Sequence, residues 1–319
     1  MTSLESDKIL LAVTGWDPEV WQTEFAKSAP KRKLVLDSEA DKNDVRYALV
    51  WKQRPGSLMN LPKLEVIFSL GAGVDHVFHD TQIPDVPIVR IVSPDLTMRM
   101  SEYVVWQVLD HHRLGLRYRE QQKQRVWHED RRQPAAHEEN VGILGLGVLG
   151  RDAAQKLRTL GFRVSGWSRR LQTIEGVTTH YGKDGLKDFL KDVDILVCLL
   201  PLTPDTKNIL SMNIFAQLKP EGPLGAPVLI NAGRGGLQNE ADILAALDRG
   251  MLSAVTLDVF NKEPLPKDSP FWTHPQVIIT PHAAASSSPQ ALVPEIVAQI
   301  ESYERGEPLK NIVDKAAQY

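Results

Sequence analysis

The 319-residue sequence predicts an α/β protein with two doubly wound parallel-sheet domains. Short apolar runs bounded by turn residues alternate with helical patterns along most of the chain. Such runs are typical of parallel strands in a sheet that is covered on both faces. A glycine-rich turn at residues 145–150 also lies between a predicted strand and a predicted helix. We therefore expect Rossmann-like and flavodoxin-like domains with a cleft between them.

The first domain should alternate strands and helices from its start. Asp17 is a good N-cap and Pro18 suits the first helical position, so one helix should begin there. Residues 71–74 should begin another helix, whose free N–H groups suit a carboxylate. The expected strands are residues 8–14, 33–36, 47–51, 64–70 and 88–92.

A long helical stretch, residues 97–126, should lead into the second domain. A final helix is expected at residues 289–305. Between them, the expected helices follow the glycine-rich turn and cover residues 185–191, 211–218 and 239–252. The expected strands are residues 140–144, 162–167, 194–200, 227–231, 254–258 and 277–280.

The glycine-rich turn has the pattern G-x-G-x-x-G in a strand–turn–helix–strand context. That context is what a dinucleotide-binding fingerprint requires. The first two glycines allow a tight turn and close approach of the pyrophosphate, and the third lets the helix pack against the strand. The residues predicted to hold the cofactor here are Gly145, Gly147, Val148, Leu149 and Gly150.

The end of the next predicted strand indicates which cofactor is preferred. NAD-specific folds place Asp or Glu there, where it bonds the ribose hydroxyls. In this chain Ser168 takes that place, followed by Arg169 and Arg170. Without a carboxylate nothing repels a 2′-phosphate, and guanidinium groups suit phosphate. We predict that NADP(H) is preferred and that NAD(H) is accepted weakly.

Three charged residues each follow a predicted buried strand near the end of the chain. Arg234 lies in a glycine-rich turn and could clamp a carboxylate with two parallel N–H bonds. His282 could give or take a proton, and Glu263 could hold its ring and favour the protonated form. Together with a hydride source, these groups suit the reduction of a 2-keto acid.

Composition narrows the classes of partner. A net charge of −3 gives no reason to expect nucleic acid or membrane partners, and one cysteine excludes an internal disulfide. The N-terminus has no signal-peptide pattern, so the cytoplasm is the expected location. The histidine pairs His76/His79 and His111/His112 lack a third ligand, so we predict no metal site.

Several short motifs near the predicted site residues resemble those of the D-2-hydroxyacid dehydrogenase family, and within it the members that reduce glyoxylate and hydroxypyruvate. These motifs are residues 69–75, 166–169 and 260–266, and the resemblance runs from about Leu10 to Tyr319. It implies NADPH-dependent reduction to glycolate and D-glycerate. In that reaction Arg234 binds the substrate carboxylate and polarises the keto oxygen, and His282 donates the proton with Glu263 behind it.

The resemblance also implies further contacts and an arrangement of the chain. Asp258 would pair with the nicotinamide carboxamide, and Leu200, Pro201, Ala232 and Gly233 would line the cofactor. Trp51, Ala72, Gly73 and Val74 would join Arg234 and His282 in binding substrate. The tail would fold back, giving a substrate-binding domain of residues 1–104 and 287–319, a cofactor domain of residues 105–286, a hinge and a homodimer.

Two alternatives remain open from the sequence. One is a reductase for bulkier 2-keto acids, against which Trp51 argues weakly by suggesting a small pocket. The other is a nucleotide-sensing, corepressor-like binding protein that keeps the fold without the chemistry. Such proteins can keep Arg234, Glu263 and His282, so these residues discriminate poorly.

Overall fold

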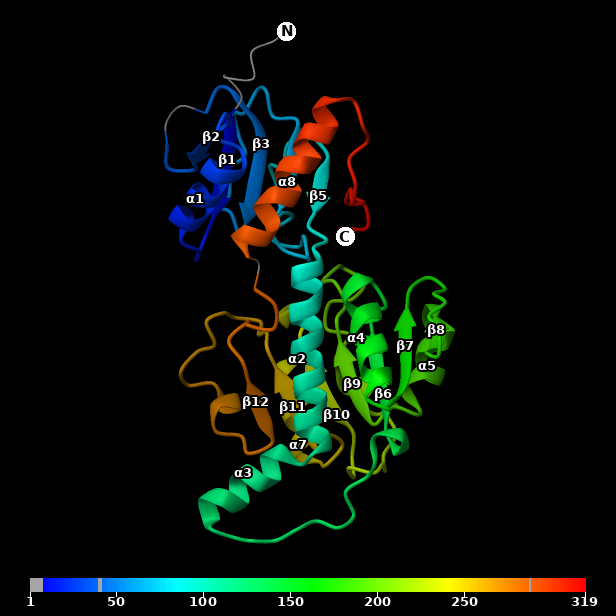
Figure 1. The fold of residues 1–319 in the computed structure, drawn as a ribbon. Coiled ribbons are helices and arrows are strands. Elements are labelled where there is room, and N and C mark those ends of the chain that lie inside the picture. The colour runs from blue at the N-terminus through cyan, green and yellow to red at the C-terminus, as the bar shows by residue number, and fades with distance from the viewer. Residues whose placement is uncertain (1–7, 40–41, 287) are drawn as a thin grey trace. The chain divides into compact units, whose positions relative to one another are not determined.

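The computed structural model describes residues 8–39, 42–286 and 288–319. The chain divides into two compact units, one of residues 1–96 with 287–319 and the other of residues 97–286. Figure 1 shows that the last helix belongs to the same unit as the first strands. The boundary at residue 96 falls within a helix, eight residues before the expected one.

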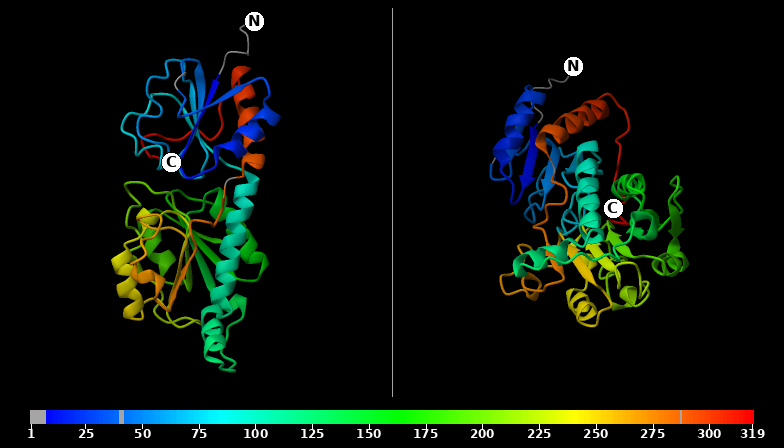
Figure 2. Two further views of the ribbon diagram at one scale, coloured as in Figure 1. Left: turned by 90° about the vertical axis from the view of Figure 1, so that its left-hand side faces the viewer. Right: turned by 60° about the horizontal axis from the view of Figure 1, so that its bottom comes forward.

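The first unit holds a five-stranded, all-parallel sheet in the order β2-β1-β3-β4-β5. This is the flavodoxin-like order. Its strands are β1 (Lys8–Val13), β2 (Lys33–Leu36), β3 (Val45–Trp51), β4 (Val66–Ser69) and β5 (Ile88–Arg90). Helices α1 (Pro18–Ser28) and α8 (Pro289–Glu304) pack together on one face, as both views in Figure 2 show. The apolar core on the other face is completed by side chains from loops and turns, such as Leu58 and Val77, rather than by a helix.

The second unit holds a seven-stranded, all-parallel sheet in the order β12-β11-β10-β9-β6-β7-β8. The strands are β6 (Asn140–Leu144), β7 (Arg163–Ser168), β8 (Thr178–Tyr181), β9 (Ile195–Cys198), β10 (Val228–Asn231), β11 (Ala254–Leu257) and β12 (Val277–Ile279). Apart from the extra strand β12, this is the Rossmann order. The strand order reverses between β6 and β9, because later strands are added beyond β9 on the opposite side from β7.

Two α-helices precede the first strand of the second unit in the described chain, and four more alternate with its strands. They are α2 (Pro94–His112), α3 (Gly115–Gln124), α4 (Val148–Thr159), α5 (Gly182–Leu190), α6 (Met212–Phe215) and α7 (Glu240–Asp248). Three short 3-10 helices also occur in the described chain: η1 (Ala136–Glu138), η2 (Gly235–Leu237) and η3 (Pro270–Trp272). α2 begins in the first unit and continues through the second.

Three expectations about local structure were wrong. The stretch at residues 97–126 is two helices, because Leu114 adopts a left-handed backbone conformation (φ 58°) between α2 and α3. Residues 71–74 do not begin a helix but lead into successive turns, so His76 and His79 share no helix. β8 was missed because it lies at a sheet edge and its residues are all partly exposed, which removes the apolar pattern.

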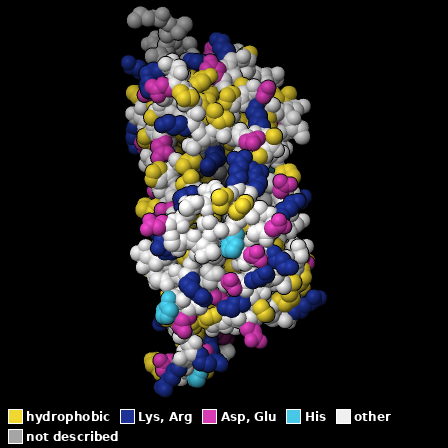
Figure 3. Space-filling model, turned by 90° about the vertical axis from the view of Figure 1, so that its right-hand side faces the viewer, with side chains coloured by type: hydrophobic (Ala, Val, Ile, Leu, Met, Phe, Trp, Pro, Cys, Tyr) yellow, Lys and Arg dark blue, Asp and Glu magenta, His cyan; other side chains and the backbone are white. Residues whose placement is uncertain are grey.

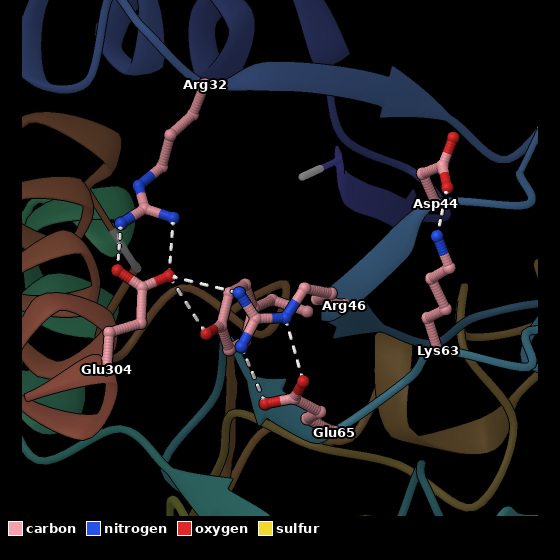
Figure 4. Close-up of polar contacts among 7 residues, drawn as sticks. Arg32, Asp44, Arg46, Lys63, Glu65 and Glu304 are labelled. Carbon is pink, nitrogen blue, oxygen red and sulfur yellow. Dashed lines mark hydrogen bonds and ion pairs between the residues drawn. The ribbon is translucent and has the colours of Figure 1, made fainter. Parts of the chain in front are cut away.

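An ion-pair network ties the end of α8 to the amino-terminal side of the first sheet (Figure 4). Arg32 donates two hydrogen bonds to the Glu304 carboxylate, at 2.9 and 2.6 Å, and the Tyr47 hydroxyl donates a third at 3.1 Å. Arg46 lies 3.7 Å from the same carboxylate and is itself paired with Glu65. The Arg32 guanidinium holds the pKa of Glu304 below its usual value.

The cysteine and the histidine pair His111/His112 are buried. Burial raises the pKa of the Cys198 thiol to about 12 and lowers that of His111 to about 4. His111 bonds to Thr256 and His112 to Glu139, so these neighbours face separate partners. Over the described residues, no cluster of three His, Cys, Asp or Glu side chains suits a metal ion, and no helix is long and apolar enough to span a membrane. Basic and acidic side chains mingle over the face in Figure 3.

Candidate active site

The glycine-rich turn after β6 forms a cradle that depends on missing side chains. Gly145 has φ +105°, and a Cβ on it would lie 2.9 Å from the Leu199 carbonyl oxygen. A Cβ on Gly150 would lie 1.9 Å from the carbonyl oxygen of Gly145, so the first turn of α4 rests directly on the strand end. A Cβ on Gly147 would meet nothing within 4 Å. The backbone at Gly147 is therefore open to approach by a ligand.

The N-terminus of α4 suits an anion. Its N-cap is Gly147, which supplies no side-chain hydrogen bond, and its first turn holds no acidic residue. The unpaired N–H groups and the helix dipole therefore favour a phosphate there. The chain continues from β6 to β7 on one side and from β9 to β10 on the other, and open α/β sheets bind nucleotides at such a point. The donors present fit the pyrophosphate of a dinucleotide.

The end of β7 supplies hydroxyl and guanidinium groups beside this cradle. Ser168 donates a hydrogen bond from Oγ to the Arg170 carbonyl at 2.6 Å, and the side chains of Arg169 and Arg170 are exposed. The loop that follows is tied to α4, because Arg151 bonds Gln172 and the Thr173 carbonyl, at 2.8 and 3.3 Å. The loop also has no acidic residue before Glu175, so no carboxylate next to Ser168, Arg169 and Arg170 would repel a 2′-phosphate.

The next two strand ends press against each other. Leu200 and Pro201 follow β9, and Ala232 and Gly233 follow β10. A Cβ on Gly233 would lie 2.9 Å from the Leu200 carbonyl oxygen, so a larger residue would push these loops apart. The four residues therefore lie along the carboxyl edge that also carries the glycine cradle. Their contact with a cofactor stays a prediction.

Arg234 is held by its own loop. The Asn231 amide donates to the Arg234 carbonyl at 3.1 Å and to Gln238 at 2.8 Å, while its oxygen accepts the Gly233 N–H at 3.1 Å. A Cβ on Gly235 would lie 1.9 Å from the Phe260 carbonyl oxygen, so this loop lies against the one after β11. The half-buried Arg234 side chain donates to the Gly233 carbonyl at 2.8 Å.

His282 and Glu263 form a hydrogen-bonded pair. Nδ1 of His282 lies 2.8 Å from Glu263 Oε2, and Glu263 Oε1 accepts the Phe260 N–H at 3.2 Å. His282 itself has a left-handed backbone (φ 53°), and its N–H bonds the Asp258 carbonyl at 2.8 Å. The two side chains are about a quarter exposed, at 28% and 23%. The imidazole is therefore oriented by a carboxylate and still reachable from outside.

Asp258 supports the histidine loop from below. Its buried carboxylate accepts the N–H groups of Ala283 and Ala284, at 2.8 and 3.0 Å. Oδ1 also accepts the Thr280 hydroxyl at 2.6 Å, and Thr280 lies 2.7 Å from the Tyr103 hydroxyl. Burial, and the nearby Asp258 charge to a lesser extent, raise the pKa of Tyr103. Asp258 thus has a clear structural function, and its predicted contact with nicotinamide stays a prediction.

The strand order explains why these side chains gather. Arg234 follows β10, Glu263 follows β11 and His282 follows β12, and these strands are neighbours in the sheet. Sequence reasoning missed the supporting residues Asn231, Thr280 and Tyr103. Asn231 had an available signal, because a polar residue at the end of a buried strand must be hydrogen-bonded.

The predicted substrate residues of the first unit lie at the carboxyl edge of its own sheet. Trp51 ends β3, and Ala72, Gly73 and Val74 follow β4. The hydroxyl of Ser69 lies 3.3 and 3.4 Å from the carbonyls of Gly71 and Gly73, which holds this turn in shape. Trp51, Ala72 and Gly73 are partly exposed, while Val74 is buried in the core.

Comparison with known proteins identifies the family. Residues 105–284 match the model of the NAD-binding domain of D-isomer-specific 2-hydroxyacid dehydrogenases. This chain belongs to the D-isomer-specific 2-hydroxyacid dehydrogenases. Within the family it is 37% identical to the glyoxylate/hydroxypyruvate reductase A of Yersinia enterocolitica over 95% of this chain and 97% of that protein. The Serratia proteamaculans protein of the same name is 39% identical over 94% and 96%.

Solved structures of family members have the same architecture. The NADPH-dependent glyoxylate/hydroxypyruvate reductase of Sinorhizobium meliloti, in complex with NADP and sulfate, is 47% identical, with a TM-score of 0.94. That similarity covers 98% of this chain and all of that one. A probable 2-hydroxyacid dehydrogenase of Rhizobium etli, in complex with NADP, is 44% identical over 98% and 99%, with a TM-score of 0.91. The predicted family and the two-sheet fold are confirmed.

Proposed function

We propose that this dehydrogenase uses NADPH to reduce glyoxylate and hydroxypyruvate to glycolate and D-glycerate. The observation that carries the proposal is the His282–Glu263 pair, 2.8 Å apart and partly exposed at the strand edge that also carries the glycine cradle. The reductases of Yersinia enterocolitica and Sinorhizobium meliloti support the choice of substrates by their similarity over nearly the full chain.

NADPH supplies the hydride, and the protein supplies orientation and charge. Arg234 binds the substrate carboxylate through its planar guanidinium and polarises the keto oxygen. His282 donates a proton to that oxygen from the ring nitrogen that does not face Glu263. Glu263 keeps the ring in that orientation. In the reverse direction His282 accepts the proton.

The residues that we propose to hold the cofactor all lie in the second unit. The N–H groups at the start of α4, together with the open backbone at Gly147, hold the pyrophosphate. Ser168, Arg169 and Arg170 hold the 2′-phosphate, and the loops after β9 and β10 line the nicotinamide half. The relatives solved with NADP or NADPH support the preference for NADPH.

The remaining expectations complete the proposal. Residues 105–286 form the cofactor-binding domain, and residues 1–104 with 287–319 bind substrate through Trp51, Ala72, Gly73 and Val74. The working form is a homodimer in the cytoplasm. Light scattering of the purified protein tests the dimer, and fractionation of the source cells tests the location.

The decisive experiment measures NADPH oxidation with glyoxylate and with hydroxypyruvate in the wild-type protein and in Arg234→Ala and Arg234→Lys. The wild type should turn over both substrates. The alanine variant should lose several kcal/mol in kcat/KM, because the carboxylate is left unpaired. Lysine should rescue poorly, since a point charge cannot replace the planar fork. A wild type that binds NADPH without oxidising it would overturn the proposed function.

A further inference from the structure

Three tryptophans of the first unit stack in series at the carboxyl edge of its sheet. Trp21 lies on Trp16 with ring centroids 5.6 Å apart and planes within 4°. Trp16 lies on Trp51 with centroids 5.0 Å apart and planes within 13°. Near-parallel indoles at these distances attract each other beyond the burial of their area. Nothing in the sequence motifs singled out Trp16 or Trp21.

Trp51 is confined by further contacts. A Cβ on Gly71 would lie 2.2 Å from Cζ3 of Trp51, so only glycine there admits the indole in this position. The buried ring of His76 contacts Trp51 at a centroid distance of 4.8 Å and an angle of 61°. Its Nε2 lies 2.9 Å from the Ser69 hydroxyl, and its Nδ1 accepts the Lys52 N–H at 3.2 Å. The indole is therefore confined by Trp16 and by the segment after β4 that carries Gly71 and His76.

The position of Trp16 is set by the backbone on both sides of it. Gly15 before it has φ +79°, a conformation that other residues rarely adopt. Asp17 after it caps α1 by accepting the Glu19 N–H at 2.9 Å. The Thr14 N–H donates to the Trp51 carbonyl at 3.0 Å, which joins this segment to the end of β3. The stacking of Trp16 on Trp51 thus rests on a fixed backbone.

We propose that Trp16 is a positioning residue that fixes the Trp51 indole as a rigid wall and so limits the size of the 2-keto acid accepted. This inference rests on the proposed function, in which Trp51 contacts substrate. The stack limits the group attached to the keto carbon, opposite the carboxylate. Loss of Trp16 frees Trp51 to move aside, and bulkier 2-keto acids then fit.

The experiment compares kcat/KM for glyoxylate with that for 2-ketobutyrate and phenylpyruvate in Trp16→Ala, Trp16→Phe and Trp51→Ala. The ratio of bulky to small substrate should rise most in Trp51→Ala and at least several-fold in Trp16→Ala. Trp16→Phe, which keeps an aromatic face for stacking, should stay near the wild type. The control is Trp127→Ala, because Trp127 is fully exposed and outside the first unit.

Two further measurements separate the possible failures. Near-ultraviolet circular dichroism should lose part of its tryptophan signal in Trp16→Ala, and NADPH affinity should be unchanged because the cofactor residues lie in the other unit. A wild type without glyoxylate-dependent NADPH oxidation overturns the proposed function. An active Trp16→Ala with wild-type substrate ratios overturns the positioning role alone. If Trp16→Ala does not fold, unchanged ratios in a folded Trp16→Leu, which lacks the aromatic face, overturn it instead.

Discussion

Two glycine-containing motifs in this chain have similar sequences at their start but fold differently. Residues 71–74 read Gly-Ala-Gly-Val after β4, and residues 145–148 read Gly-Leu-Gly-Val after β6. The second opens α4 and the first leads into turns. The residue three places beyond the second glycine differs, because His76 stands in the first motif where Gly150 stands in the second.

That one position explains much of the difference. The missing side chain of Gly150 lets the first turn of α4 rest on the Gly145 carbonyl and present its N–H groups. His76 instead uses its ring to reach Ser69 and the backbone of Lys52, and to pack on Trp51. A strand followed by G-x-G can thus form an anion site or pack against an aromatic ring. The outcome depends on the residue three places after the second glycine, which is Gly150 in one motif and His76 in the other.

Replacing His282, at the carboxyl edge of the second sheet, should give the largest effect. His282→Asn should lower turnover by about 10²–10⁴-fold, because it removes the general acid. NADPH affinity should stay close to the wild type. His76→Asn, at the carboxyl edge of the first sheet, should act mainly on KM for the keto acid. Steady-state kinetics and cofactor titration check both, and near-normal turnover in His282→Asn would assign the proton to another group.

Substitution of the two glycines at the start of α4 tests their separate contributions. Gly150→Ala should destabilise the protein by about 1–3 kcal/mol or more and weaken NADPH binding, because the Cβ overlaps backbone. Gly147→Ala should leave stability nearly unchanged, since that Cβ meets no protein atom, and should weaken NADPH binding alone. Denaturant unfolding with cofactor titration separates the two. Equal losses of stability would contradict the open cradle at Gly147.

The loop after β7 should determine whether the protein prefers NADPH or NADH. Each charge-assisted bond to the 2′-phosphate contributes about 1.5–3 kcal/mol, so even one gives more than tenfold preference for NADPH. The combined change of Ser168→Asp, Arg169→Ala and Arg170→Ala should erode or invert it. The measurement is kcat/KM for NADPH and NADH at equal glyoxylate. A wild type that uses both cofactors equally well would refute the assignment of these residues.

The opposite end of the first sheet offers a test of stability without chemistry. Glu304→Gln should lower the free energy of unfolding at neutral pH by about 1.5–3 kcal/mol, through loss of charge-assisted bonds from Arg32. The folded-state pKa of Glu304 lies below the ordinary value of a glutamate, so this stabilisation is fully present above the ordinary value and is lost as pH falls through the folded value. Unfolding curves against pH measure it.

The control for that variant is Glu301→Gln, which changes an exposed carboxylate one turn earlier on α8. Its stability should match the wild type, because exposed charges contribute little. Both variants should keep normal turnover. A Glu304→Gln protein as stable as Glu301→Gln at neutral pH would show that the network in Figure 4 contributes nothing to stability.

The smallest expected effect concerns the orientation of the His282 imidazole. Glu263→Gln replaces the carboxylate that lies 2.8 Å from Nδ1 of His282 with a neutral amide, so the ring is held less firmly. Turnover should therefore fall, but by less than in His282→Asn, while NADPH affinity stays close to the wild type. Steady-state kinetics and cofactor titration check it, and an unchanged turnover would remove Glu263 from the acid–base step.

The sequence by itself determined the local elements that short-range rules control. Asp17 caps α1 as expected, and β2 and β6 have the predicted bounds. Gly161 follows α4 in a left-handed conformation (φ +92°), which glycine adopts readily beyond the end of a helix. These features depend on hydrogen bonds and side-chain periods within a few residues, so a single chain segment contains the information.

Only the tertiary structure decided which distant residues meet. The neighbouring strands β10, β11 and β12 bring Arg234, Glu263 and His282 to one edge, and residues 16, 21 and 51 form the tryptophan stack. The turns after Gly73 likewise depend on contacts of His76 with Lys52 across the sheet edge. Strand order and packing between separate segments set these contacts, and no local sequence period encodes either.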